Sequence, residues 1–252
     1  MKARYLTQAF CALALAAASF AASAVDHVFS NTASITINDN STASPYPSAI
    51  AVSGLSGNIT KVTVTLNTMS HTWPGDLNVI LVAPGGQKIA LMQRVGTTAL
   101  GCSTDLTSGT LIFDAAAASN MSACSYPASG GTFLPTIGLT LTNSAAPAPA
   151  GPYSNDLGSL NGSSAVQNGT WNLYVSDHAG ADSGGIYGGW SLNISDDTPD
   201  VTCASEGYTG TKLEWCKNIC ERGYTGSTLA MWIRRWTDRY RTLPYCALEP
   251  EV

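Results

Sequence analysis

The run Leu77-Asn-Val-Ile-Leu-Val-Ala-Pro-Gly-Gly86 decides the fold class of this chain. Its almost wholly apolar start stops at a Pro-Gly-Gly turn, as expected of a strand with little exposed surface. Just upstream, Lys61-Val-Thr-Val-Thr-Leu66 alternates polar and apolar residues, which predicts a strand buried on one face. Two neighbouring strands of this kind indicate a β-protein.

Further strand patterns lie on both sides of this pair. Ser34–Ile37 alternates, and the other predicted strands are Lys88–Met92, Thr110–Phe113, Thr170–Ser176 and Trp190–Ile194. Gly- and Asn-rich turns separate them, and the region from Val28 to Ile194 shows no long amphipathic helical pattern. Such a succession of short strands predicts an all-β sandwich or jelly roll.

The N-terminus reads as a targeting segment. Lys2 and Arg4 precede an apolar run that begins at Phe10, and Ala22-Ser-Ala24 suits a cleavage site. We therefore expect a signal peptide over residues 1–24, with Cys11 removed in it. The apolar run is too short to span a bilayer. The mature chain should be secreted, to the extracellular space or the periplasm, with no membrane span.

The six remaining cysteines predict disulfides. An even number of cysteines in an exported chain favours disulfides. A four-cysteine zinc site is disfavoured because the sequence lacks the two CxxC pairs that such a site uses. Cys102 and Cys124 should bond each other. The other four allow three pairings, and two of them, four residues apart on one helical face, should each bond one of the outer two. These four are Cys203, Cys216, Cys220 and Cys246.

Composition changes sharply around Asp196–Asp200, so we place a domain boundary between residues 25–198 and 199–252. The Pro- and Ala-rich stretch at 144–152 is interpreted as a surface loop of the first domain. In the tail, Gly207–Leu213 recurs as Gly223–Leu229, and each copy opens a helix. We expect a disulfide-stapled helical hairpin, with a capping box formed by Thr211 and Glu214.

Charge is distributed unevenly between the two domains. Residues 25–198 hold ten acids and three bases, whereas residues 199–252 hold seven of each. An acidic main domain argues against nucleic acid and anionic membrane as partners and suits divalent cations. The second tail helix carries an aromatic stripe, expected to form a small core, beside several arginines that form either a solvated face or a grip on an acidic partner.

Three segments together resemble a known family. They are His71-Thr-Trp-Pro-Gly-Asp-Leu77 with the Pro-Gly-Gly turn after it, Thr110-Leu-Ile-Phe-Asp114, and the closing run from Leu160 through Asn168-Gly-Thr-Trp-Asn-Leu-Tyr-Val-Ser-Asp177 to Trp190-Ser-Leu192. Their order and gaps resemble the P domain (Homo B domain) of subtilisin-like proprotein convertases. The resemblance implies a jelly-roll sandwich that supports the folding, stability and calcium dependence of a protease. No protease domain is recognisable here.

Four aspartates are candidate metal ligands. Asp76 follows a Gly turn, Asp114 ends a strand, and Asp177 and Asp182 flank a short Gly-containing loop. Ca²⁺ prefers six to eight carboxylate and carbonyl oxygens, so the four would form a calcium site if they met at one end of the sandwich. The alternative is turn chemistry, in which Asp beside Gly caps a turn through local hydrogen bonds.

Two other functions are suggested by short stretches of the sequence. Asp182-Ser183-Gly184-Gly185 mimics the nucleophile segment of chymotrypsin-like enzymes, but no histidine stands in the context that those enzymes show, so we expect no catalytic residue and disfavour a serine endopeptidase. Trp73, in the loop from His71 to Asp76, is expected to be exposed and could stack on a sugar or peptide, which would favour an adhesion or glycan-binding module. The sequence favours a non-catalytic, calcium-dependent accessory of a secreted subtilisin-like protease or another extracellular protein.

Overall fold

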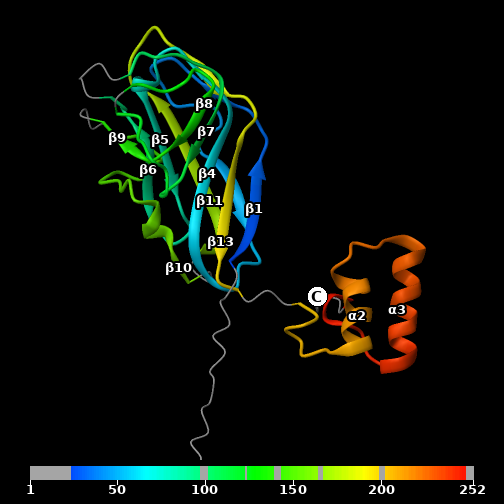
Figure 1. Cartoon of the computed structure of the whole chain (residues 1–252). Coiled ribbons are helices and arrows are strands. Elements are labelled where there is room, and N and C mark those ends of the chain that lie inside the picture. Colours follow the sequence, from blue (N-terminus) through cyan, green and yellow to red (C-terminus); the bar gives the residue numbers. More distant parts are fainter. Residues whose placement is uncertain are drawn as a thin grey trace, which may run out of the picture.

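A computed structural model describes residues 24–96, 102–122, 124–138, 143–163, 167–198 and 202–247. The predicted signal peptide, apart from Ala24, and linker residues 199 and 200 lie outside the described residues. The described chain forms two β-sheets followed by a pair of helices (Figure 1). Within these ranges no helix is long and apolar enough to cross a membrane.

The first sheet is built around one long strand, β4 (Asn58–His71). Its strand order is β1 (Val25–Asn31), β13 (Trp190–Asp196), β4, β12 (Gly184–Ile186) and β2 (Ile35–Ile37). Three further strands extend it: β7 (Leu106–Phe113) and β10 (Gly162–Ser163) pair with β4, and β8 (Gly130–Phe133) pairs with β7. Every partner of β4 runs antiparallel to it.

The second sheet has the order β3 (Ser48–Val52), β11 (Gly169–Asp177), β5 (Leu77–Val82), β6 (Lys88–Gln93) and β9 (Thr136–Ile137). Two 3-10 turns, η1 (Pro74–Asp76) and η2 (Leu157–Leu160), connect strands. The turn η1 joins β4 of the first sheet directly to β5 of the second. The end of β4 therefore lies where the two sheets meet.

One apolar core lies between the sheets, with side chains from β4, β5, β11 and β13. Trp171 and Trp190 are fully buried in it, as their strand patterns indicated. Each indole N–H finds an acceptor, the Gln167 carbonyl at 2.9 Å and Ser48 Oγ at 3.0 Å. Burial of each large apolar side chain contributes roughly 2–3 kcal/mol before entropy is counted. The predicted strands all exist, in a sandwich of two sheets.

The tail is the expected helical hairpin, formed by α2 (Gly210–Cys220) and α3 (Gly226–Tyr240) and followed by η3 (Tyr245–Ala247). It has a core of its own around the fully buried Trp236. The predicted capping box is wrong. Helix α2 begins before Thr211, its N-cap makes no side-chain hydrogen bond, and Glu214 instead pairs with Arg222 at 2.7 Å.

Three disulfides join the cysteines. Cys102 bonds Cys124 in the sandwich, while Cys203–Cys216 and Cys220–Cys246 staple the tail. Cys216 and Cys220 point from α2 to different partners, as their spacing on one helical face indicated. The tail therefore takes one of the pairings that the sequence left open.

Candidate functional site

The candidate site is built around the turn that follows β4. His71, the last residue of β4, is fully buried. The backbone N–H of Trp73 donates to His71 Nδ1 at 3.2 Å, which places the ring hydrogen on Nε2. Nε2 lies 3.3 Å from Oδ2 of Asp177, at the end of β11. This buried pair links the ends of the two sheets.

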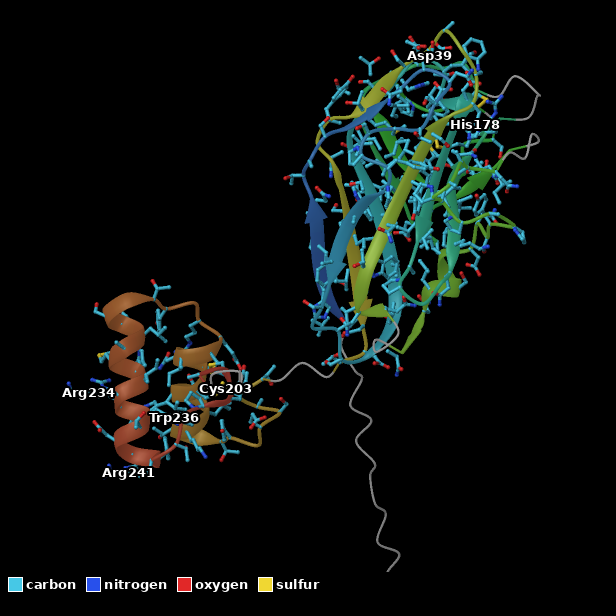
Figure 2. All side chains as sticks on the ribbon, turned by 180° about the vertical axis from the view of Figure 1, so that it is seen from behind. Asp39, His178, Cys203, Arg234, Trp236 and Arg241 are labelled. Carbon is cyan, nitrogen blue, oxygen red and sulfur yellow. A yellow bond between two sulfur atoms is a disulfide. The ribbon has the colours of Figure 1, made fainter. Side chains whose placement is uncertain are left out.

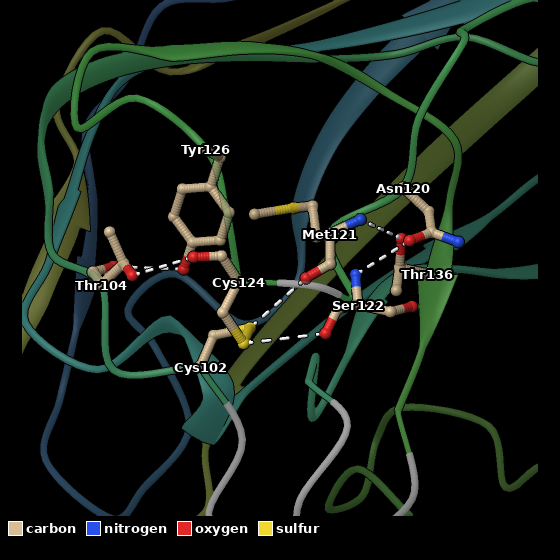
Figure 3. The surroundings of a disulfide bond; sticks show 8 residues. All are labelled: Cys102, Thr104, Asn120, Met121, Ser122, Cys124, Tyr126 and Thr136. Carbon is tan, nitrogen blue, oxygen red and sulfur yellow. Dashed lines mark hydrogen bonds between the residues drawn. A yellow bond between two sulfur atoms is a disulfide. The ribbon is translucent and has the colours of Figure 1, made fainter.

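Asp76 forms a second buried pair beside the first. Arg94 Nη1, from the residue after β6, lies 3.3 Å from Asp76 Oδ1, and the His178 backbone N–H donates to the Asp76 carbonyl at 3.0 Å. The N–H of Gly75 donates to the Cys102 carbonyl at 2.9 Å. The turn η1 is thus fixed to β11, β6 and the Cys102–Cys124 disulfide, whose surroundings Figure 3 shows.

Asp182 is held at the same end by β12. Gly184 pairs with His71 in register, and the Thr72 hydroxyl donates to Asp182 Oδ1 at 2.5 Å. A Cβ on Gly184 would lie 2.0 Å from the Ser70 carbonyl oxygen, so only glycine permits this approach of β12 to β4. The loop from Asp177 to Gly184 is therefore held at both ends, by the contact of Asp177 with His71 and by the pairing of Gly184 with β4.

The charges of this end act on one another. Burial raises the pKa of Asp76, with Arg94 acting against the rise and the charges of Asp177 and Asp182 adding to it. Burial likewise raises the pKa of Asp177; a hydrogen bond from the Ala179 N–H and the neighbouring His71 act against it, and the charge of Asp39 adds to it. These carboxyl groups thus form one electrostatic unit.

A shallow cleft of about 600 Å³ opens above His71. Asp39 and Asp105 carry carboxylates into its lining, together with Thr72, Ser183 and Tyr187, and no Lys or Arg lines it. Figure 2 shows Asp39 at the same end of the sandwich as His178. We call this feature the acidic cleft.

The four predicted metal ligands do not all meet. Asp76, Asp177 and Asp182 share the end that holds His71, but Asp114 does not join them. In β7, Leu106 pairs with His71 while Phe113 pairs with Val64, so Asp114 lies at the opposite end of that strand. The expectation of four converging carboxylates fails because β7 runs antiparallel to β4.

Asp114 has a local partner. Lys61 Nζ lies 2.7 Å from its Oδ2. Partial burial alone would raise the pKa of Asp114, but hydrogen bonds from Lys61 and the Ala116 N–H outweigh it and hold the pKa below its usual value. Asp114 thus acts as a strand-end ion pair and turn residue, in line with the turn chemistry weighed for it.

A metal at the other three aspartates would need further oxygens. Within the described ranges, the only three His, Cys, Asp or Glu ligand atoms mutually within 4.8 Å belong to Cys203, Cys216 and Cys220, which are disulfide-bonded. Asp177 Oδ2 is buried and faces His71 Nε2 at 3.3 Å, so a cation bound there would compete with His71 for this oxygen. The all-oxygen donor set suits a hard cation such as Ca²⁺, with carbonyl or water oxygens completing its shell.

Serine-protease geometry does not form among the described residues. His178 Nε2 contacts Ser176 Oγ at 3.0 Å, but Ser176 is buried, and Asp177 pairs with His71 rather than His178. Burial lowers the pKa of His178. Ser183 lines the acidic cleft without a hydrogen bond to a histidine. Within the described ranges, no serine contacts a histidine that in turn contacts an acid, as a catalytic triad requires.

Trp73 is half-buried in the turn rather than fully exposed. Sequence reasoning missed Asp39 and Asp105 as companions of the predicted aspartates. Asp39 stands in an Asn-Asp-Asn turn that gives no sign of its distant neighbours. Only the pairing of β2 with β12 brings it to the cleft.

Comparison with known proteins bears on the strands around this site. Among solved structures, the complex of Aeromonas sobria serine protease with its chaperone (ORF2) matches at 14% identity and a TM-score of 0.26. The match covers 68% of this chain but 26% of that chain, so this chain spans about a quarter of its length. A likeness this weak carries no argument. No curated protein matches.

A family model matches more locally. The proprotein convertase P-domain matches residues 59–111, which hold almost all of β4, the turn η1, β5, β6 and most of β7. This stretch contributes His71, Asp76 and Arg94 to the site. Residues 59–111 are thus similar to a proprotein convertase P-domain, in the stretch that holds the first of the three sequence motifs.

Proposed function

We propose that this chain is a secreted, non-catalytic P-domain module with a jelly-roll frame, which binds and supports a subtilisin-like serine protease outside the cell. The observation that carries the proposal is the P-domain match over residues 59–111, the segment that builds the His71 and Asp76 end. In the family that the sequence resembles, this domain supports a protease without performing catalysis.

The absence of a triad among the described residues supports a binding role. His71 is occupied on both ring nitrogens, by the Trp73 N–H and by Asp177. The Ser176 hydroxyl next to His178 is buried away from any peptide. Neither histidine therefore links an accessible serine to an acid, as a catalytic site of this kind requires.

Export is supported by the disulfides. Three cystines in one chain suit an oxidising compartment. The predicted signal peptide would deliver the chain there.

Calcium is part of the proposal. Asp76, Asp177 and Asp182 would hold the ion, which would offset the repulsion among carboxylates that burial has brought together. A bound ion would stiffen η1 and the loop from Asp177 to Gly184. This is the end at which a partner would find a fixed surface.

The proposal is tested by capture. The mature chain is immobilised and exposed to the culture fluid of the producing organism in calcium, then eluted with a chelator, and the eluate is identified by mass spectrometry. Recovery of a subtilisin-like protease, lost when calcium is omitted, is the expected result. Recovery of envelope glycans alone, or of nothing above a bead control, would overturn the proposal.

A matched pair of variants sharpens the capture. Asp182→Asn removes one carboxylate from the acidic end, whereas Asp114→Asn removes one from the far end of β7. We expect the first to weaken capture and the second to leave it unchanged. Equal capture by both variants would show that the partner does not bind at this end of the sandwich.

A further inference from the structure

The tail carries a second surface feature whose charge is opposite to that of the acidic cleft. A groove of about 560 Å³ runs along the outer side of α3 and is lined by Met231, Arg234, Arg235 and Asp238, with Ser227 and Ala230. Figure 2 shows Arg234 on the side of α3 away from α2, with Trp236 between the helices. We call this feature the arginine groove.

The arginines of this groove have no acidic partner in the described chain. Arg222 is the tail arginine that pairs with a carboxylate, whereas neither Arg234 nor Arg235 forms an ion pair there. The Arg235 guanidinium stacks over the Trp232 ring at 5.0 Å, which fixes its direction. Met231, at 40% exposed, adds an apolar surface to the lining. The groove thus offers two cations against the single carboxylate of Asp238, beside an apolar side chain.

The acidic cleft offers the complement. Asp39 and Asp105 line it, and Tyr187, at 52% exposed, supplies an aromatic surface on which a guanidinium can stack. Among the described residues neither carboxylate forms an ion pair. Two carboxylates with an exposed ring therefore match two guanidinium groups with an exposed thioether.

We propose that the arginine groove of one molecule docks into the acidic cleft of a second copy of this chain. This contact goes beyond the proposed protease-accessory function and does not depend on it. Arg234 and Arg235 would meet Asp39 and Asp105, and Met231 would lie near Tyr187. A single such contact leaves one cleft and one groove free, so it is head-to-tail and can continue into rings or open chains.

A contact within one molecule is disfavoured by reach. Asp196, just before the linker, pairs with Ile59 at the start of β4. The cleft is lined by His71, at the other end of the same strand. Twelve residues of strand place these ends roughly 40 Å apart. The three residues between Thr198 and Thr202 allow at most roughly 14 Å. The 15 residues of α3 add roughly 22 Å, so the tail would have to extend fully toward the cleft to reach it.

Other polyanions fit less well than a second copy. Phosphate-rich surfaces would attract the arginines, but the net charge of −5 opposes approach to an extended negative surface. A local match of two carboxylates and two guanidiniums is much less sensitive to net charge, because salt screens charges beyond about 8 Å. The test below treats adsorption to anionic vesicles as a contrary outcome.

The test is sedimentation velocity of the full mature chain between about one and about a hundred micromolar. We expect the weight-average sedimentation coefficient to rise with concentration at low salt and to fall back as salt is raised. A coefficient that does not change with concentration would overturn the proposal. So would binding to anionic lipid vesicles, without self-association, that is lost in Arg234→Glu/Arg235→Glu.

Charge reversal supplies a specific check. Arg234→Glu/Arg235→Glu and Asp39→Lys/Asp105→Lys should each weaken self-association at least about ten-fold. Mixed together, the two variants should associate with each other, because the reversed groove of one then matches the reversed cleft of the other. Failure of the mixture to associate would contradict the pairing.

The matched controls change the net charge by the same amount as the test variants. Arg239→Glu/Arg241→Glu changes the same charge on the same tail outside the groove, and Asp26→Lys/Glu206→Lys does so outside the cleft. Both should self-associate like the parent chain. An equal loss in these controls would assign the effect to net charge and would overturn the docking contact. Because capture of a protease is a separate readout, failure here leaves the proposed function standing.

Discussion

At the residue scale, the site depends on charged side chains that the fold has withdrawn from water. His71, Asp76, Asp177 and Arg94 form two adjacent buried pairs where the sheets meet. Breaking a buried pair by removing one partner typically costs about 3–5 kcal/mol, because the other charge is left uncompensated. These residues therefore both stabilise the fold and set the charge of the site. Variants must be chosen so that a change in charge can be told apart from a loss of stability.

Calcium binding is tested best at Asp182, which is the least buried of the three proposed ligands. A saturating ion at a hundred times its Kd would stabilise the parent chain by about 2.7 kcal/mol, a rise in Tm of roughly 5–10 °C. Asp177→Ala/Asp182→Ala should abolish this rise and Asp182→Asn should reduce it, whereas Asp114→Asn should keep it. Calorimetry with and without calcium gives the answer, and an unchanged rise in the double variant would remove these residues from the site.

The raised pKa of Asp76 makes a pH prediction. The folded state holds this proton more tightly than the unfolded state, whose pKa is near 3.8. Its stabilising contribution is therefore present below pH 3.8 and is lost as pH rises through the raised pKa. In calcium-free urea unfolding from about pH 3 to about pH 6, the parent chain should lose stability relative to Asp76→Asn. A gain over that window would contradict the assignment.

How much the sequence predicts differs between these residues. Asp76 and Asp177 were found because each stands at a strand end in a motif, and a strand end places its side chain at an edge of the sandwich. Asp114 has the same local pattern but the opposite strand direction, which only the pairing of β7 with β4 reveals. Asp39 and Asp105 reach the cleft through pairings between distant strands, which carry no local signal.

At the element scale, β4 and β12 together position the acidic end. The strands predicted from alternation or from apolar runs were recovered, while β1, β3, β8, β9, β10 and β12 were not predicted. The three-residue β12 begins with two glycines, a composition that favours a turn in isolation. It becomes a strand because it fits between β2 and β4, where Gly184 lets the backbones approach.

Gly184→Ala tests that packing. Its Cβ would lie 2.0 Å from the Ser70 carbonyl oxygen, so β12 must shift, at a cost of about 1–3 kcal/mol. Gly180→Ala in the same loop is the control, since its Cβ would meet nothing closer than Asp39 Oδ1 at 3.9 Å. Chemical denaturation of both variants should show a loss for Gly184→Ala alone. Equal stability of the two would show that β12 is not held closely against β4.

The Cys102–Cys124 disulfide supports the turn η1 from outside. Its residues are 22 apart in sequence, and Cys102 accepts the hydrogen bond of Gly75. Cys102→Ala/Cys124→Ala should lower the free energy of unfolding by about 3 kcal/mol, through greater freedom of the unfolded chain. Denaturant unfolding measures it. A variant as stable as the parent would show that the surrounding hydrogen bonds suffice.

At the scale of the whole molecule, an acidic sandwich is joined to a tail with a basic helix face. The linker composition and the charge change at Asp196–Asp200 predict this division, and the tail has its own core and its own two disulfides. The sequence also predicted the hairpin, because apolar spacing and cysteine spacing are local signals. It could not predict which surfaces of the two parts match, since that depends on side chains brought together from distant strands.

The central claim is that this chain serves a serine protease without being one. The direct measurement is fluorophosphonate labelling of the calcium-dependent, chelator-eluted fraction captured by the immobilised chain. The reagent forms a covalent bond only with an activated serine. We expect a labelled subtilisin-like partner and no label on the immobilised chain. Labelling of the chain itself, or an eluate with no labelled protein, would contradict the account.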